Sequence, residues 1–252
     1  MERKLEICCY SLESAIAAEA YGADRIELCD NYSEGGTTPS DATIRFSVEK
    51  LKIPVNVIIR PRGGDFLYTD VEYETIKQDV LRAKELHANG VVVGFLTADG
   101  EMDMARTQEI IEMAKPMELT VHRAFDMCKH PLQALEQLKE IGVTRVLTSG
   151  AKNTAPEGSD LLAQLVEKAE GRIIIMPGSG VNENTLSELI HHTSALEFHS
   201  SAKTFEKSKM TYFNKDISMG GVDSVDEFSK VAVDPVKVKK MREILDHTSS
   251  SS

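Results

Sequence analysis

The 252-residue chain has few cysteines, no long apolar run and a deficit of positive charge. Basic residues number 29 against 40 acidic ones, which gives a formal charge of −11, whereas a nucleic-acid-binding domain normally carries a basic stripe. No stretch approaches the roughly 18 consecutive apolar residues that a membrane helix needs. We therefore expect neither a nucleic-acid partner nor a membrane partner.

Four cysteines in a chain of this length are too few for a disulfide scaffold, which predicts reduced thiols. The basic residues near the start are followed by no apolar segment of the kind found in signal peptides. Both features predict a cytoplasmic location. The serine run at 249–252 predicts a disordered tail after a single domain over residues 1–248.

Short β-branched segments alternate with amphipathic segments along nearly the whole chain. Eight strands are predicted, at residues 5–10, 25–30, 55–60, 90–96, 119–125, 145–149, 172–176 and 195–199. Helices are predicted between them, for example at 12–21, 71–88 and 132–141, and a last helix at 227–247. This pattern predicts the α/β class, as a single (β/α)8 TIM-type barrel with an extended C-terminal segment. A doubly wound open sheet is the alternative, weakened because no G-x-G-x-x-G follows the first strand.

Strand alternation predicts which polar side chains face the lumen of the barrel. Those of the first, second and last strands are Glu6, Cys8, Glu27, Cys29, Glu197 and His199. Buried carboxylates are costly unless each is paired or binds something, so a self-satisfied ion-pair network and a functional site both remain open. Two neighbouring carboxylates resist ionising together, so we expect a raised pKa for a glutamate beside Glu197.

Other strand ends carry basic, acidic and small residues at the face where barrel enzymes place their sites. Strand 3 ends at Arg60 and Arg62, and strand 5 ends at His122 and Asp126. Small residues that could expose backbone donors to an anion follow strands 6, 7 and 8: Ser149, Gly178, Ser179, Gly180, Ser200 and Ser201. We expect Arg60 to face these small residues across the barrel.

Cysteine spacing predicts at most one metal site. Cys8 and Cys29 should face the lumen from adjacent strands, and soft thiolates select Cu(I) or zinc, although buried cysteine is often only packing. Cys9 points to the opposite face from Cys8, and the chain has no C-x-x-C or H-E-x-x-H motif. His191 and His192 are expected at the surface, near a helix end.

Seven segments together resemble the copper homeostasis protein CutC family. They are residues 5–9, 22–29, 34–39, 59–66, 122–126, 145–150 and 197–202, in order along the chain. The resemblance implies a cytoplasmic (β/α) barrel that self-associates, as a homodimer or higher homo-oligomer, with a role in copper handling. It also implies that Cys8 and Cys29 are the copper-binding cysteines.

Two functional hypotheses follow. In the first, the chain is a copper homeostasis protein that binds Cu(I) at Cys8 and Cys29. In the second, it is a barrel enzyme that acts on a small anionic substrate, a class that includes phosphorylated compounds. The catalytic residues would then be Glu6, Glu27, Arg60, His122, Asp126, Glu197 and His199. The anion-binding residues would be Arg60, Arg62, Ser149, Gly178, Ser179, Gly180, Ser200 and Ser201.

Overall fold

The computed structural model describes residues 2–214, 216–217 and 226–249. Eight parallel strands form the central sheet: β1 (Lys4–Cys9), β2 (Arg25–Leu28), β3 (Val55–Ile58), β4 (Gly90–Val93), β5 (Glu118–Val121), β6 (Arg145–Thr148), β7 (Ile174–Pro177) and β8 (Glu197–Ser200). Each predicted strand is confirmed, with boundaries that differ from the prediction by at most four residues. The hydrogen-bonded order runs β7-β6-β5-β4-β3-β2-β1-β8.

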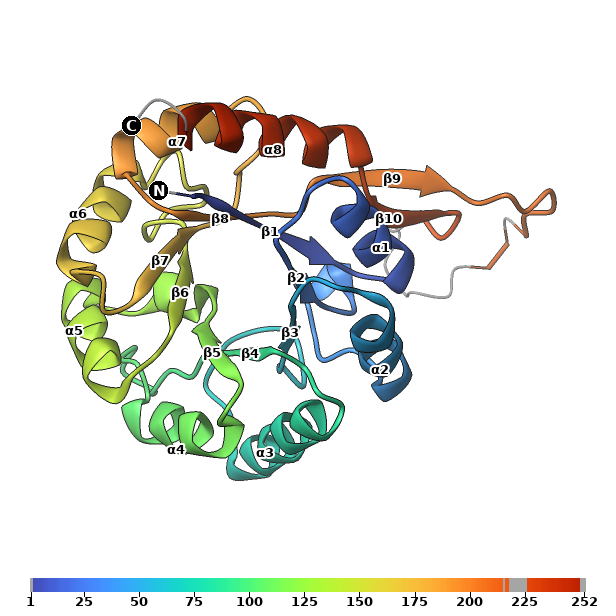
Figure 1. Ribbon diagram of the computed structural model, residues 1–252. Helices are drawn as coiled ribbons and strands as arrows, with labels where there is room; N and C mark the ends of the chain where they lie inside the picture. The colour runs from blue at the N-terminus through green and yellow to red at the C-terminus, as the bar shows by residue number, and fades with distance from the viewer. Residues whose placement is uncertain (1, 215, 218–225, 250–252) are drawn as a thin grey trace.

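Helices surround the strands in a ring, which confirms the predicted (β/α)8 barrel (Figure 1). They are α1 (Leu12–Ala20), α2 (Asp41–Lys50), α3 (Asp70–Glu85), α4 (Met104–Ala114), α5 (Pro131–Ile141), α6 (Ser159–Ala169), α7 (Leu186–Thr193) and α8 (Pro235–Ser249). Two short 3₁₀ helices, η1 (Tyr32–Glu34) and η2 (Arg123–Met127), follow β2 and β5. His191 and His192 are exposed in the last turn of α7, as predicted.

The helix boundaries have local causes. Thr69 and Glu72 form a capping box at the start of α3, which satisfies two backbone N–H groups. Helix α5 begins at Pro131 and ends before Gly142, which adopts the left-handed conformation.

The C-terminal segment differs from the prediction. Strand β9 (Lys203–Lys207) pairs antiparallel with β10 (Ser229–Val233), and this hairpin projects from the barrel (Figure 1). The last helix was predicted to begin at residue 227, but residues 229–233 are a strand. Helix α8 begins after it at Pro235, because proline suits the first turn of a helix. Of the predicted tail, residues 250–252 lie outside the described residues.

The main hydrophobic core lies between the strands and the helices. Leu5, Ile7, Ile26 and Leu28 are completely buried in it, on the outer faces of β1 and β2. The alternate residues face the lumen, where a small separate cluster contains Cys8, Cys29, Ile58 and Val92. The lumen therefore holds a small apolar cluster together with buried polar side chains, among them Glu6, Glu27, Glu197 and His199.

Candidate functional site at the mouth of the barrel

A layer of paired charges fills the lower part of the lumen. Arg25 donates from Nε to Glu6 and from Nη2 to Glu197 Oε2, the latter at 2.6 Å. Arg145 donates from Nε to the same Glu197 oxygen, also at 2.6 Å. All four side chains are less than a tenth exposed. Sequence reasoning predicted the glutamates here but missed both arginines, which are the first residues of β2 and β6.

These arginines keep two of the glutamates ionised. Burial raises the pKa of Glu197, but hydrogen bonds and charge from Arg145 and Arg25 outweigh it and leave the pKa lowered. The pKa of Glu6 is also lowered, because Arg25 and His199 outweigh its burial. The expected raised pKa therefore does not occur at Glu6, whose carboxylate shares Arg25 with Glu197.

Above the charged layer lies a group of thiol, carboxyl and imidazole side chains. The register places Cys8 beside Glu27 and Glu6 beside His199 on neighbouring strands. Cys8 Sγ lies 3.5 Å from Cys29 Sγ, so the two cysteines meet in the lumen as predicted. His199 Nδ1 lies 2.8 Å from Glu6 Oε1, and Nε2 lies 3.6 Å from Glu27 Oε2.

The neighbours within this group set its protonation. A hydrogen bond from Cys29 lowers the pKa of Cys8, and His199 adds to this against the effect of burial. Burial and the hydrogen bond to Cys8 raise the pKa of Cys29. Burial, followed by the charge of Cys8, raises the pKa of Glu27. Burial lowers the pKa of His199, but hydrogen bonds to Cys8 and Glu6 raise it overall. A carboxyl group with a raised pKa and an imidazole with a raised pKa therefore lie side by side.

Cys8, Glu27 and Cys29 form a buried group that could hold a metal ion. One potential ligand atom from each residue lies within 4.8 Å of the other two. Cys9 lies on the opposite face of β1, in the outer core, as strand alternation predicts. The group offers two sulfurs and one carboxylate.

Arg60 lies away from this group and does not face the small-residue loops. Its Nη1 donates to the carbonyls of Glu34 and Gly36, at 2.6 and 2.8 Å, and its Nη2 donates to Gly64 O at 2.9 Å. It therefore joins the loops after β2 and β3. Arg62 instead pairs with Glu72 and Asp65 at the surface.

His122 and Asp126 lie on the opposite side of the barrel from Cys8. His122 packs against the Phe66 ring, and its Nδ1 accepts a hydrogen bond from Ala124 N–H at 3.1 Å. Burial, with the charge of Arg60, lowers the pKa of His122 to about 3, so the ring is neutral near pH 7. Asp126 accepts the backbone and hydroxyl hydrogen bonds of Ser149. These bonds order the loop after β6.

A cleft of about 670 Å³ opens at the carboxyl ends of the strands. Four of the predicted small residues line it: Ser179, Gly180, Ser200 and Ser201. Cys8 and His199 also line it, so the thiol and imidazole group faces the cleft. Gly178 packs closely on Leu147 instead, since a Cβ there would lie 2.4 Å from Leu147 Cδ1. Lys203 and Lys237, from the C-terminal segment, also line the cleft, and this was not predicted from the sequence.

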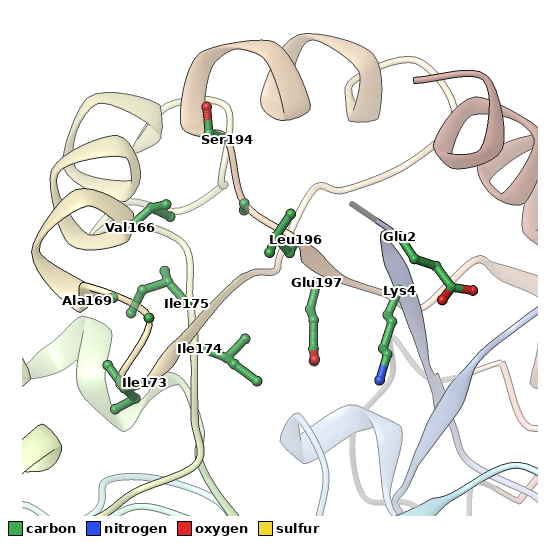
Figure 2. A pocket seen from close by; sticks show the side chains of 12 residues that line it. Glu2, Lys4, Val166, Ala169, Ile173, Ile174, Ile175, Ser194, Leu196 and Glu197 are labelled. Atoms are coloured by element: carbon green, nitrogen blue, oxygen red, sulfur yellow. The ribbon is translucent and has the colours of Figure 1, made fainter. Parts of the chain in front are cut away.

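A second hollow, of about 360 Å³, lies at the amino ends of β7 and β8. Its lining is mainly apolar, and Figure 2 shows Ile174, Lys4 and Glu197 directed into the same space. Barrel enzymes place their sites at the other end of the strands, so we centre the functional site on the mouth.

The family of the chain follows from comparison with known proteins. The model of the CutC family matches residues 3–204. The chain belongs to the CutC family. A CutC family protein of Parabacteroides distasonis is 50% identical over 240 residues, covering 95% of this chain and 99% of the relative. A human relative named copper homeostasis protein cutC homolog is 45% identical, covering 95% of this chain and 88% of the relative.

Solved structures agree on the fold of this CutC family member. A CutC crystal structure from Streptococcus agalactiae matches with a TM-score of 0.76 and 33% identity, covering 79% of this chain and 98% of that chain. A phosphoribosylanthranilate isomerase from Thermotoga maritima matches with a TM-score of 0.58 at 13% identity, which shows a common fold alone. Within the described residues, no helix is both long and apolar enough to cross a membrane.

Proposed function

We propose that this CutC family member binds Cu(I) through Cys8 and Cys29 and takes part in copper homeostasis. The observation that carries the proposal is the separation of 3.5 Å between the two thiol sulfurs in a buried part of the lumen. The human relative is named for copper homeostasis, which supports the same role for this chain.

The donor set suits a soft, singly charged ion. Soft thiolate ligands select Cu(I) or zinc, and structural zinc sites generally have four ligands, whereas this group offers three, which favours Cu(I). The lowered pKa of Cys8 favours the thiolate form that binds metal. Ile58 and Val92 form one buried cluster with the two cysteines and make one side of the site apolar.

The test is an anaerobic competition titration with a chromophoric Cu(I) chelator. We expect the Cys8→Ser, Cys29→Ser double variant to lose Cu(I) binding. Cys128→Ser is the matched control: Cys128 is also buried, but its pKa is raised to about 11 by burial, and it should bind normally. Equal competition by the double variant and the wild-type chain would contradict the proposal.

The same proposal places the protein in the cytoplasm as a homodimer or higher homo-oligomer. All four cysteines are free, and two of them lie close enough to need a reducing compartment.

The proposed self-association has a candidate surface. Large apolar side chains are exposed on β9 and the segment after it, including Phe205, Met210 and Tyr212. Changing Phe205 and Tyr212 to serine should lower the mass measured by sedimentation to that of one chain. An unchanged mass would show that these side chains do not form the contact between subunits.

A second candidate function is catalysis on a small anionic substrate. The observation that favours it is the pairing of Glu27 with His199 at 3.6 Å beside the open cleft. Burial, with the charge of Cys8, raises the pKa of Glu27, and a raised pKa favours the protonated form that a general acid requires. Glu6 and Glu197 are ionised and held by arginine, which suits a positioning role better than proton transfer.

A further inference from the structure

The cleft at the mouth gathers positive charge in an acidic chain. Its lining includes Lys203, Lys237 and Arg123, of which Arg123 pairs with Asp126 at 2.8 Å, and among the described residues only one Asp or Glu, Glu183. The chain as a whole has a formal charge of −11. The local balance of charge is therefore opposite to that of the whole chain, and a cleft lined by one sign of charge attracts ligands of the other sign.

The two lysines have no carboxylate partner within the described residues. Lys203 Nζ donates to the Tyr32 hydroxyl at 2.5 Å and lies over the Tyr32 ring, 5.0 Å from its centroid. Lys237 Nζ donates to the Lys203 carbonyl at 2.8 Å. Elsewhere lysines do find carboxylates; Lys115, for example, pairs with Glu112 at 2.7 Å. The hydrogen bonds of Lys203 and Lys237 leave their positive charges uncompensated.

The loop after β7 presents its backbone on the same cleft. Ser179 and Gly180 both have positive φ values, of 68° and 76°. A Cβ on Gly180 would lie 2.9 Å from Thr154 Cβ, so this position requires glycine both for its conformation and for its close packing. The Ser200 hydroxyl donates to Val181 O at 2.6 Å and joins this loop to the end of β8. The loops after β7 and β8 therefore form one wall of the cleft.

We propose that this cleft binds the phosphoryl group of a small phosphate ester, held by Lys203 and Lys237 beside the loops after β7 and β8. Two ammonium charges match a dianion, and lysine binds phosphate as a compact point charge. The loops after strands 7 and 8 are also the position at which many (β/α)8 barrels hold phosphate. The inference deepens the second candidate function by naming its ligand class, although binding itself requires no catalysis.

The experiment titrates metal-free protein with inorganic phosphate and follows thermal stability, with ionic strength held constant by chloride. We expect phosphate to stabilise the wild-type chain, and Lys203→Gln and Lys237→Gln each to weaken its binding about tenfold, the loss of one charge-assisted contact. Lys240→Gln is the matched control, because Lys240 is exposed on the same helix and lies outside the cleft lining. It should bind phosphate as the wild type does.

Two further titrations separate the possible ligands and the two proposals. Tighter binding of glycerol phosphate than of inorganic phosphate is expected for an ester site, whereas tighter binding of the free ion would overturn the ester assignment. The Cys29→Ser variant removes a proposed copper ligand that lies outside the cleft lining and should keep phosphate binding, so the copper and phosphate proposals can fail separately. The phosphate site is refuted if chloride stabilises the wild type equally, or if Lys240→Gln weakens binding as much as the two cleft variants.

Discussion

Replacing Glu197 by glutamine tests whether the charged layer of the lumen stabilises the barrel. Glu197 accepts hydrogen bonds from Arg25 and Arg145, at 2.6 Å each, and all three side chains are nearly inaccessible to solvent. Glutamine keeps the shape but removes the negative charge that both guanidinium groups share. Removing one partner of a buried ion pair typically costs about 3–5 kcal/mol of unfolding free energy. Because glutamine can still accept one hydrogen bond, we expect Glu197→Gln to lower the free energy of unfolding by about 3 kcal/mol near pH 7.

The pH dependence of this loss has a definite sign. The folded-state pKa of Glu197 lies below its unfolded value, so its stabilising contribution is present above the unfolded pKa. The contribution falls as the pH drops below about 4.3, the ordinary pKa of glutamate, and is lost through the folded-state pKa. The stability difference between wild type and Glu197→Gln should therefore shrink in acid.

Urea unfolding followed by circular dichroism, at several pH values between 7 and 3, measures this difference. Glu118→Gln is the matched control, because Glu118 also pairs with Arg145, at 3.1 Å, but its side chain is 50% exposed. An exposed pair contributes roughly 0–1 kcal/mol. Equal losses for the two variants, or a loss for Glu197→Gln that does not change with pH, would refute a stabilising role for the buried charges.

Two further predictions concern Arg60 and His122, which lie outside the charged layer of the lumen. Arg60→Ala removes donors from three backbone carbonyls, of Glu34, Gly36 and Gly64, so it should destabilise the fold by about 1.5–3 kcal/mol or more. Because these acceptors do not titrate, the loss measured by urea unfolding should be the same at pH 7 and pH 5.5, and a smaller loss in acid would contradict this. The pKa of His122 is lowered to about 3, so its ring resonances in an NMR titration should not shift between pH 8 and pH 5. A titration midpoint near pH 6.5, the ordinary pKa of histidine, would contradict the lowered pKa that burial gives this ring.

The fold and the central residues of the site follow from period-two alternation, which is why they were predictable. Alternation of apolar and polar residues places Cys8 and Glu27 in the lumen whatever the exact strand ends, and the structure confirms this. It also places Arg25 on the face of Glu27, but the sequence does not show which arginine reaches which carboxylate. Neither Arg25 nor Arg145 was singled out from the sequence, and the structure shows that these two arginines pair with Glu6 and Glu197.

Other features depended on contacts between distant segments. The strand conformation of residues 229–233 comes from pairing with β9, more than twenty residues earlier in the chain. The local sequence does not show this pairing, so these residues were predicted as part of the last helix. The contribution of Lys203 and Lys237 to the mouth likewise depends on how the C-terminal segment packs. The sequence gives no local signal for either contact, since neither lysine follows a barrel strand directly in a recognisable motif.

The ion pair between Arg145 and Glu197 has a consequence for the order in which the chain folds. The two residues are separated by 52 positions, and Glu197 begins the last strand of the barrel. Among the described residues, Glu197 is the only deeply buried carboxylate that forms an ion pair with Arg145, since Glu118 is half exposed, so during synthesis the arginine is available well before this partner. Burying a guanidinium group without a counter-charge costs a large amount of free energy. Because the pair with Glu118 leaves this charge partly open to solvent, we expect the interior around β6 to lose its water fully only after β8 has docked.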